Sequence, residues 1–242
     1  MLTYILIGVA VLFVLLICFA LAIASFSSEN YLENLKETSN LYNSSNLSTL
    51  DFVSEINEKH FSNRLTIEKC PQYQDHYAKN KIALSRETMY SNNLASLSIV
   101  SHELGHAKQD TEGDKLDKHW KLRILGRRIG FFFMPFLLIG IVLCLLSLFE
   151  ILKESYVLYI GIGCIAVSLA IFFFAIILKY KEIKVEKEAS VYALDFLREI
   201  LSESEVAKCK NFLNSARLTY WASLLKTMLG WTFLTSKNKM FR

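Results

Sequence analysis

One stretch decides how this chain is interpreted, and it reads Ser101-His102-Glu103-Leu104-Gly105-His106-Ala107. On a helix, side chains four residues apart lie on one face, so the imidazoles of His102 and His106 can bind one metal ion. Glu103 follows the first histidine, within reach of a water on that metal, where a carboxylate can act as a general base. The alternative is a solvated helix that holds two histidines by chance. We favour the metal site, because chance matches to this spacing are rare.

Hydrophobic residues make up 52% of the 242 residues, and they are gathered in long runs rather than spread along the chain. Such clustering is typical of a membrane protein with a modest soluble portion. The net charge of +4 is small, so the positions of the charges say more than their sum. Cys70 and Cys209 are isolated and the other three cysteines lie within apolar runs, which excludes a disulfide framework and a CxxC metal site.

The first apolar run, Leu2 to Phe26, carries no charged residue and is long enough to cross a bilayer. A signal peptide is the competing interpretation, because Ala20, Ala22 and Ala24 offer small-residue cleavage patterns. However, no Lys or Arg precedes the run, and the run is longer than the core of a signal peptide. We therefore expect an uncleaved transmembrane anchor over residues 1–26.

Two further apolar runs, residues 129–149 and 156–178, are separated by a short turn and predict a transmembrane hairpin. Basic residues cluster at its two outer ends, whereas the turn is only weakly charged. The clusters are Lys115, Lys118, Lys121, Arg123, Arg127 and Arg128 before the hairpin, and Lys179, Lys181 and Lys184 after it. Basic flanks stay in the cytoplasm, so we expect residues 27–128 and the chain from Lys179 onward to be cytoplasmic, with the N-terminus outside. The same argument disfavours nucleic acid as a partner of this basic cluster.

Two short β-like runs, Arg64 to Ile67 and Lys81 to Leu84, precede the histidines, and the loop predicted between them contains Asp75-His76-Tyr77. An exposed edge strand beside the metal helix can hold a substrate backbone extended by β-augmentation. An ordinary hairpin that only packs against the helix fits the sequence equally well. The residues Ser91-Asn92-Asn93 then predict the N-cap of the metal helix.

A zinc site with two histidines needs a third protein ligand, with the fourth position open to water. The predicted topology places three acidic candidates on the same side of the membrane as the histidines: Glu182, Glu186 and Glu188. Glu186 lies near the centre of an apolar helical stripe, where a carboxylate is costly unless it is paired or bound to a metal. Glu188 falls on the opposite face and is expected to be solvated. Glu182 shares the face of Glu186 nearer the membrane end, so Glu186 is the predicted ligand and Glu182 the reserve.

The last apolar stretch, about residues 216–234, is short and has Lys226 at its middle. It fits an interfacial helix, a helix packed under the soluble domain, or a fourth span with Lys226 facing protein. We favour the first two interpretations, which keep the basic residues of the tail on the cytoplasmic side.

Three segments together match a family pattern. They are Ile82-Ala83-Leu84-Ser85 with Ser101 to Gln109, then Val185-Glu186-Lys187-Glu188-Ala189-Ser190, and finally Ala216-Arg217-Leu218-Thr219-Tyr220. They resemble the strand and metal helix, the Val-Glu-Phe-Asp-Ala-Ser motif and the closing Ala-Ala-Leu-Thr-Tyr segment of the YugP-like neutral zinc metallopeptidases of bacterial membranes.

The resemblance implies one zinc ion per chain, held by His102, His106 and Glu186, with Glu103 as the catalytic base. The chain departs from the family pattern at Lys187 and Glu188, where the family has Phe and Asp, and at Arg217 in a stretch of usually small residues. These departures leave the metal ligands intact and concern local packing and substrate-contacting surfaces.

The sequence therefore predicts a mainly α membrane protein in which an N-terminal anchor helix and a transmembrane helical hairpin carry a small α+β zincin-like cytoplasmic domain. The expected segments are an anchor (1–26), a zincin-like domain with the HExxH helix (27–128), the hairpin (129–178), a helical segment with the third ligand (179–215), and an amphipathic or membrane-associated C-terminal helix (216–242).

The predicted activity is that of a zinc-dependent metalloendopeptidase of the bacterial plasma membrane, with a peptide or protein substrate and no nucleic-acid partner. The alternative is a catalytically silent membrane scaffold in which zinc only joins the soluble domain to the hairpin. Glu103 favours the enzyme, because a structural zinc site does not need it and is usually closed by a fourth ligand. A transporter is disfavoured, because the spans carry no internal charge. Donors for an oxyanion can be sought among His76, Tyr77, Tyr192 and Tyr220, although packing or surface roles are favoured for each.

Overall fold

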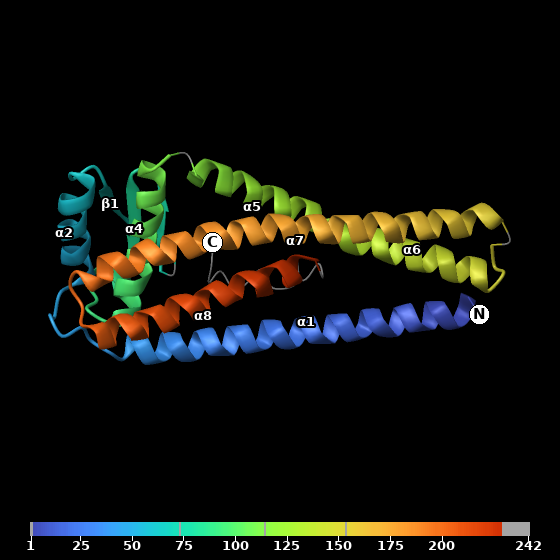
Figure 1. Ribbon diagram of the computed structural model, residues 1–242, viewed down its shortest axis with the longest axis horizontal. Helices are drawn as coiled ribbons and strands as arrows, with labels where there is room; N and C mark the ends of the chain where they lie inside the picture. The colour runs from blue at the N-terminus through green and yellow to red at the C-terminus, as the bar shows by residue number, and fades with distance from the viewer. Residues whose placement is uncertain (1, 73, 114, 153, 229–242) are drawn as a thin grey trace. The chain divides into compact units, whose positions relative to one another are not determined.

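The computed structural model describes residues 2–72, 74–113, 115–152 and 154–228, and it shows a mainly helical chain with one small sheet (Figure 1). Its contacts divide the described chain into two compact units. The helical unit takes in residues 2–27, 121–181 and 220–228, and the α/β unit takes in residues 28–120 and 182–219. Several helices begin in one unit and end in the other, so each unit is described by itself.

The first helix, α1 (Leu2–Ser39), continues well past Phe26, the last residue of the apolar run. The polar residues that follow this run therefore extend the same helix instead of starting a new element. The side chain of Tyr31 from this extension is buried against Phe212, with ring centroids 5.6 Å apart.

In the helical unit, α5 (Lys115–Phe131) and α6 (Phe133–Leu148) are separated by a break at Phe132. Pro135 explains the break, because a proline ring clashes with the carbonyl four residues earlier, here that of Phe131. The next helix, α7 (Ser155–Arg198), continues without interruption through the predicted span 156–178 and the predicted third-ligand segment. Two stretches, Ile124–Leu148 and Ser155–Arg198, are long and apolar enough to cross a membrane by length and composition.

Close packing of α6 against α7 depends on Gly140. A Cβ at this position would lie 2.8 Å from the carbonyl oxygen of Gly161 and 2.7 Å from the side chain of Ile165. Small residues at such a crossing let two helix backbones approach each other, which is how helices commonly pack in membranes. A larger residue at position 140 would push the two helices apart.

In the α/β unit, the end of α1 is followed by α2 (Thr49–Phe61), which Ser48 caps by accepting a hydrogen bond from the backbone N–H of Asp51. The strands β1 (Thr66–Cys70), β2 (His76–Ala78) and β3 (Lys81–Ser85) follow, then α3 (Arg86–Met89) and α4 (Leu94–Thr111). The last helix of the chain, α8 (Glu203–Met228), starts in this unit.

The three strands form one sheet in the order β1-β3-β2, with β1 parallel to β3 and β2 antiparallel to it. Residues 75–77 were expected to form a loop, and this expectation is wrong because His76–Ala78 is a strand that pairs with β3. The two predicted strands also do not form an ordinary hairpin, since β1 and β3 are parallel. The central strand β3 is buried from Ile82 to Ser85, as its position between two neighbours requires.

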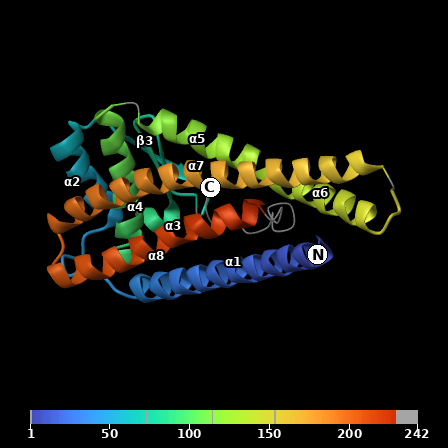
Figure 2. The ribbon, with the colours of Figure 1, turned by 45° about the vertical axis from the view of Figure 1, so that its right-hand side comes forward.

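The core of the α/β unit is formed mainly by residues from α2, β3, α4, α7 and α8, together with Tyr77 of β2 and Met89 of α3. The largest fully buried side chains include Phe52, Ile82, Leu97, Leu104 and Leu197. Burying a large aliphatic or aromatic side chain contributes about 1.5–3 kcal/mol, so this cluster holds α4 and the end of α7 in a defined rotation. Both views show α4 beside the carboxyl-terminal part of α7 (Figures 1 and 2).

The C-terminal helix α8 includes both the polar residues after 202 and the start of the predicted apolar stretch. The predicted continuation to residue 234 and the basic tail lie outside the described residues.

Candidate metal centre

Helix α4 presents both histidines of the HExxH motif. Asn93 caps the helix by accepting a hydrogen bond from the N–H of Ser96 at 2.8 Å, as the sequence predicted. Leu97, Val100 and Leu104 are buried in the core. Because these positions fix the rotation of the helix, the rings of His102 and His106 lie together on one side of it, with ring centroids 4.8 Å apart.

Gly105 brings α7 against this helix. A Cβ built on Gly105 would lie 2.2 Å from the backbone oxygen of Ala189, a separation that no side chain can occupy. The missing side chain therefore lets the α7 backbone contact α4 within the motif itself. The sequence had suggested that the glycine allows another element to approach, and the structure identifies that element as α7.

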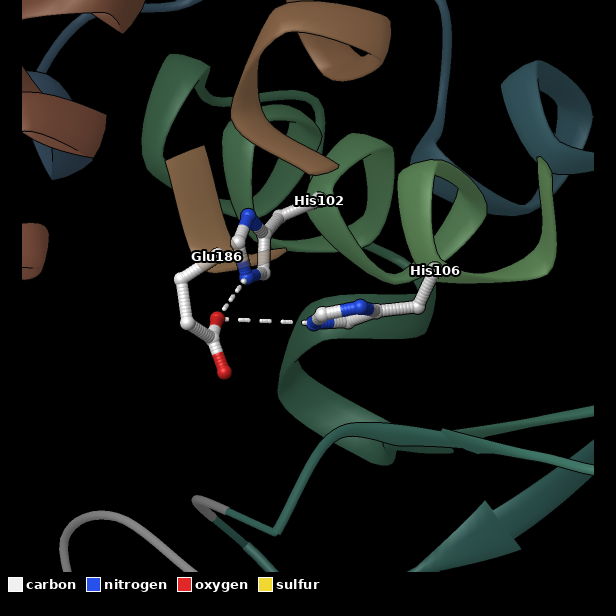
Figure 3. A group of neighbouring side chains, drawn as sticks. All are labelled: His102, His106 and Glu186. Atoms are coloured by element: carbon white, nitrogen blue, oxygen red, sulfur yellow. Dashed lines mark hydrogen bonds and ion pairs between the residues drawn. The ribbon is translucent and has the colours of Figure 1, made fainter. Parts of the chain in front are cut away.

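Glu186 of α7 lies beside both histidines (Figure 3). Its Oε2 atom is 3.1 Å from Nε2 of His102 and 3.5 Å from Nε2 of His106. One ligand atom from each of the three residues lies within 4.8 Å of the others. The two helices thus bring together residues about 80 positions apart in the chain.

The three residues fit a zinc ion by donor chemistry and by spacing. Two imidazole nitrogens and one carboxylate oxygen are a common set of protein ligands for a zinc ion that keeps an open position. Ligand atoms at 2.0–2.1 Å from a tetrahedral zinc lie about 3.3 Å from one another. The separations of 3.1 and 3.5 Å between Glu186 and the two imidazoles are close to this value, and all three ligand atoms lie within 4.8 Å of one another.

Glu186 is 2% exposed, and its electrostatic surroundings favour the ionised form. Burial alone would raise its pKa, but hydrogen bonds from His102 and His106 hold the pKa of Glu186 well below its usual range. Burial would likewise lower the pKa of His106, whereas its hydrogen bond to Glu186 and the charge of that carboxylate raise it to about 9. The negatively charged carboxylate of Glu186 therefore lies beside the Nε2 atoms of both histidines.

The carboxylate of Glu103 is hydrogen-bonded to the sheet. Its Oε2 accepts a hydrogen bond from the backbone N–H of Tyr77 in β2 at 2.8 Å. Burial raises the pKa of Glu103, and the charges of His106 and His102 and the Tyr77 N–H offset part of this rise. The hydroxyl of Tyr77 donates to Asp110 at 2.7 Å, so β2 is joined to α4 at two points.

Comparison with protein-family models shows which family the chain belongs to. The model described as "Putative neutral zinc metallopeptidase" matches residues 11–235. The chain belongs to this family. Searches of curated proteins and of solved structures find no match. The family membership confirms the resemblance noted in the sequence, and it supports zinc as the metal and a hydrolase as the class of protein.

The other two acidic candidates, Glu182 and Glu188, have different surroundings from Glu186. Glu182 is 4% exposed and lies one turn before Glu186 on α7. Glu188 was expected to be solvated, and this expectation is wrong. It is half-buried and accepts a hydrogen bond from the side chain of Gln109 at 3.0 Å, because the close approach of α7 to α4 covers that face as well.

Each of the four residues considered as an oxyanion donor makes a contact within the protein. The hydroxyl of Tyr77 is bonded to Asp110, and that of Tyr192 donates to Glu112 at 2.5 Å. Tyr220 lies under the ammonium group of Lys179, 5.2 Å from the ring centroid to Nζ. The ring of His76 contacts the backbone oxygen of Gln74 at 2.7 Å. The role of these four residues in binding an oxyanion stays a prediction.

Proposed function

We propose that this chain is a membrane-anchored zinc endopeptidase whose catalytic site is formed by the α/β unit. One observation carries the proposal: a single carboxylate oxygen of Glu186 lies within 3.5 Å of the Nε2 atoms of both His102 and His106. Glu103 follows His102 on the same helix, so a metal-binding set and a base lie side by side. Membership of the zinc metallopeptidase family supports peptide hydrolysis as the reaction.

In the proposed mechanism, His102, His106 and Glu186 hold the metal. Bound zinc would polarise the scissile carbonyl and lower the pKa of a water molecule. Glu103 takes a proton from the attacking water and later delivers it to the leaving amine. Burial raises the pKa of Glu103, which makes its carboxylate a stronger base towards the proton of the water.

The proposed substrate is a peptide or protein segment in extended conformation. Strand β2 lies at the edge of the sheet, and the N–H of Tyr77 points to Glu103. The outer side of this edge strand therefore faces the proposed base, which accepts the hydrogen bond of the Tyr77 N–H. A peptide that pairs with β2 by β-augmentation would have its backbone beside the metal ligands.

We further propose that the apolar helices anchor the protein in the bacterial plasma membrane, with the α/β unit in the cytoplasm and the N-terminus outside. Two stretches with sufficient length and hydropathy support the membrane location, and the basic flanks of the predicted hairpin support the orientation. A reporter fused after Arg242 should be active in the cytoplasm and an N-terminal tag should be accessible from outside. The reverse pattern would refute the orientation.

The function is tested with purified full-length protein, zinc analysis and a panel of peptide and protein substrates. Glu103→Gln should keep zinc and lose cleavage by at least about 100-fold, because it removes the base but not a ligand. Glu186→Ala should lose zinc, because it removes a ligand. Asp195→Asn, an exposed acidic position on α7 paired with Arg198, is the matched control and should behave as the parent. A protein that binds zinc but shows no Glu103-dependent cleavage would be a scaffold instead.

A further inference from the structure

Gln109 is fully buried one turn after His106 on α4, and all of its side-chain polar atoms are engaged. Its Oε1 lies 3.0 Å from Nδ1 of His106. Its Nε2 donates to the backbone oxygen of Val185 at 2.9 Å and to a carboxylate oxygen of Glu188 at 3.0 Å. One amide thus contacts a candidate ligand on its own helix and the segment of α7 that carries Glu186.

The direction of this amide is determined by its neighbours. A backbone carbonyl and a carboxylate can only accept, so the NH₂ end of Gln109 must face Val185 and Glu188. The amide oxygen then faces His106 and can only accept, which requires the proton of that ring to be on Nδ1. In a neutral imidazole with Nδ1 protonated, Nε2 has the free lone pair, and Nε2 is the nitrogen directed at Glu186.

Ser190 of α7 makes the reciprocal contact to the other histidine. Its hydroxyl donates to the backbone oxygen of Glu186 at 2.9 Å, and its oxygen lies 3.3 Å from Nδ1 of His102. Because the single hydroxyl proton is directed at the carbonyl, the oxygen accepts from the Nδ1–H of His102. Gln109 of α4 thus contacts α7, and Ser190 of α7 contacts α4. Both side chains also donate to a backbone oxygen at or next to Glu186, that of Val185 for Gln109 and that of Glu186 for Ser190.

We propose that Gln109 and Ser190 are positioning residues of the metal centre, holding the Nδ1 proton and the ring orientation of His106 and His102 so that both Nε2 atoms face Glu186. This inference rests on the proposed zinc function. Partners of this kind orient metal-binding histidines and raise their basicity, and their loss typically lowers metal affinity about 10–100-fold. The competing interpretation is that both residues only join α4 to α7, in which case their removal changes stability but not the state of a particular ring.

The first measurement is Zn²⁺ affinity of the full chain in detergent, determined by competition with a chromogenic chelator. Gln109→Met keeps the length of the side chain without its hydrogen bonds, and Ser190→Ala removes one oxygen atom. We expect about 10–100-fold weaker Zn²⁺ binding for Gln109→Met and a smaller loss for Ser190→Ala. Ser98→Ala is the control, because this buried hydroxyl of α4 bonds to Leu94 of its own helix; it should bind Zn²⁺ as the parent does.

The second measurement separates positioning from packing. With ¹⁵N-labelled histidine, the chain's 5 histidines can be followed individually in the zinc-loaded protein by NMR. Gln109→Met should shift or lose the Nδ1–H resonance of His106 and leave that of His102 in place. Ser190→Ala should do the reverse. A general loss of packing would not produce this reciprocal pattern.

The inference is overturned if both variants keep the parent's Zn²⁺ affinity and both Nδ1–H resonances are unchanged. It is also overturned if Ser98→Ala weakens Zn²⁺ binding as much as the other two variants. Should Gln109→Met fail to fold, the smaller change in Ser190→Ala decides the question through the His102 resonance. A parent that binds no Zn²⁺ would refute the proposed function itself, and a parent that binds Zn²⁺ without cleaving peptides would leave this inference standing.

Discussion

At the scale of single residues, His106 and Glu186 couple proton binding to folding. The pKa of His106 is raised from 6.5 to about 9 because the favourable contact with Glu186 outweighs the cost of burial. A histidine with a raised folded-state pKa stabilises the folded state fully below its unfolded pKa, and this contribution is lost as the pH rises through the folded value. Zinc, in contrast, needs neutral imidazoles.

We therefore predict opposite pH trends with and without the metal. Between about pH 6.5 and 9, the metal-free protein should lose the stability that it owes to His106, whereas the additional stability given by Zn²⁺ should increase over the same range. Thermal unfolding of chelator-treated and zinc-loaded samples across this range checks both trends. The comparison is made against His106→Gln, which removes the titrating group. Parallel trends in the parent and this variant would contradict the prediction.

The hydroxyl of Tyr77 contributes to the stability of the folded protein through two hydrogen bonds. It is buried, donates to Asp110 at 2.7 Å and accepts from the N–H of Asn80 at 2.9 Å. Tyr77→Phe would leave both partners without this contact, and we predict a loss of about 1–3 kcal/mol in the free energy of unfolding. Denaturant titration measures it. Tyr42→Phe is the control, since that side chain is 69% exposed and the change should be neutral.

At the scale of elements, the contact between α4 and α7 determines whether the three candidate ligands meet. Gly105 permits this contact at some cost, because glycine in a helix is about 1 kcal/mol less favourable than alanine. An added Cβ would meet the backbone of Ala189 and not a flexible side chain. The helices would therefore have to separate, and Glu186 would move away from the histidines.

We predict that Gly105→Ala destabilises the protein by about 1–3 kcal/mol in spite of the gain in helix propensity, and that it weakens Zn²⁺ binding at least about 10-fold. Denaturant unfolding and chelator competition measure the two effects. Gly163→Ala is the matched control, because a Cβ on this helical glycine would meet nothing within 4 Å. Parent-like stability and affinity in Gly105→Ala would show that α7 does not need this close approach.

At the scale of the whole molecule, the candidate zinc site links α4 to α7, two helices separated in the chain by α5 and α6. A ligand that binds only the folded state stabilises it by about 2.7 kcal/mol at a free concentration 100 times its Kd. For a chain of this size, such a gain raises the Tm by about 5–10 °C.

Chelation should therefore lower the Tm of the zinc-loaded parent by about this amount, and readdition of Zn²⁺ should restore it. Differential scanning fluorimetry in detergent measures the shift. Glu186→Ala should show little response to chelation, because it lacks one of the three ligands. An equal response in this variant would mean that the stabilising zinc binds elsewhere.

Local sequence patterns were sufficient for several features of this protein. The spacing of His102 and His106 predicts a shared face of one helix, and Asn93 predicts where that helix begins. The phase of an apolar stripe selected Glu186 from three acidic residues, and the structure places it beside both histidines. These inferences succeed because helical periodicity is a local property of the chain. The ligand roles themselves stay predictions until a metal is measured.

Strand β2 and the surroundings of Gln109 and Glu188 could be known only from the tertiary structure. Strand β2 is only three residues long and depends on pairing with β3 and on the contacts of Tyr77 with α4. Gln109 of α4 and Glu188 of α7 look like ordinary polar positions until the two helices pack together, and their hydrogen bond joins residues 79 positions apart. Such features arise from long-range contacts between elements, whose partners no local pattern specifies. The HExxH sequence by itself therefore placed two candidate ligands and a candidate base on one helix, whereas the packing of α7 at Gly105 decided which residue lies beside them.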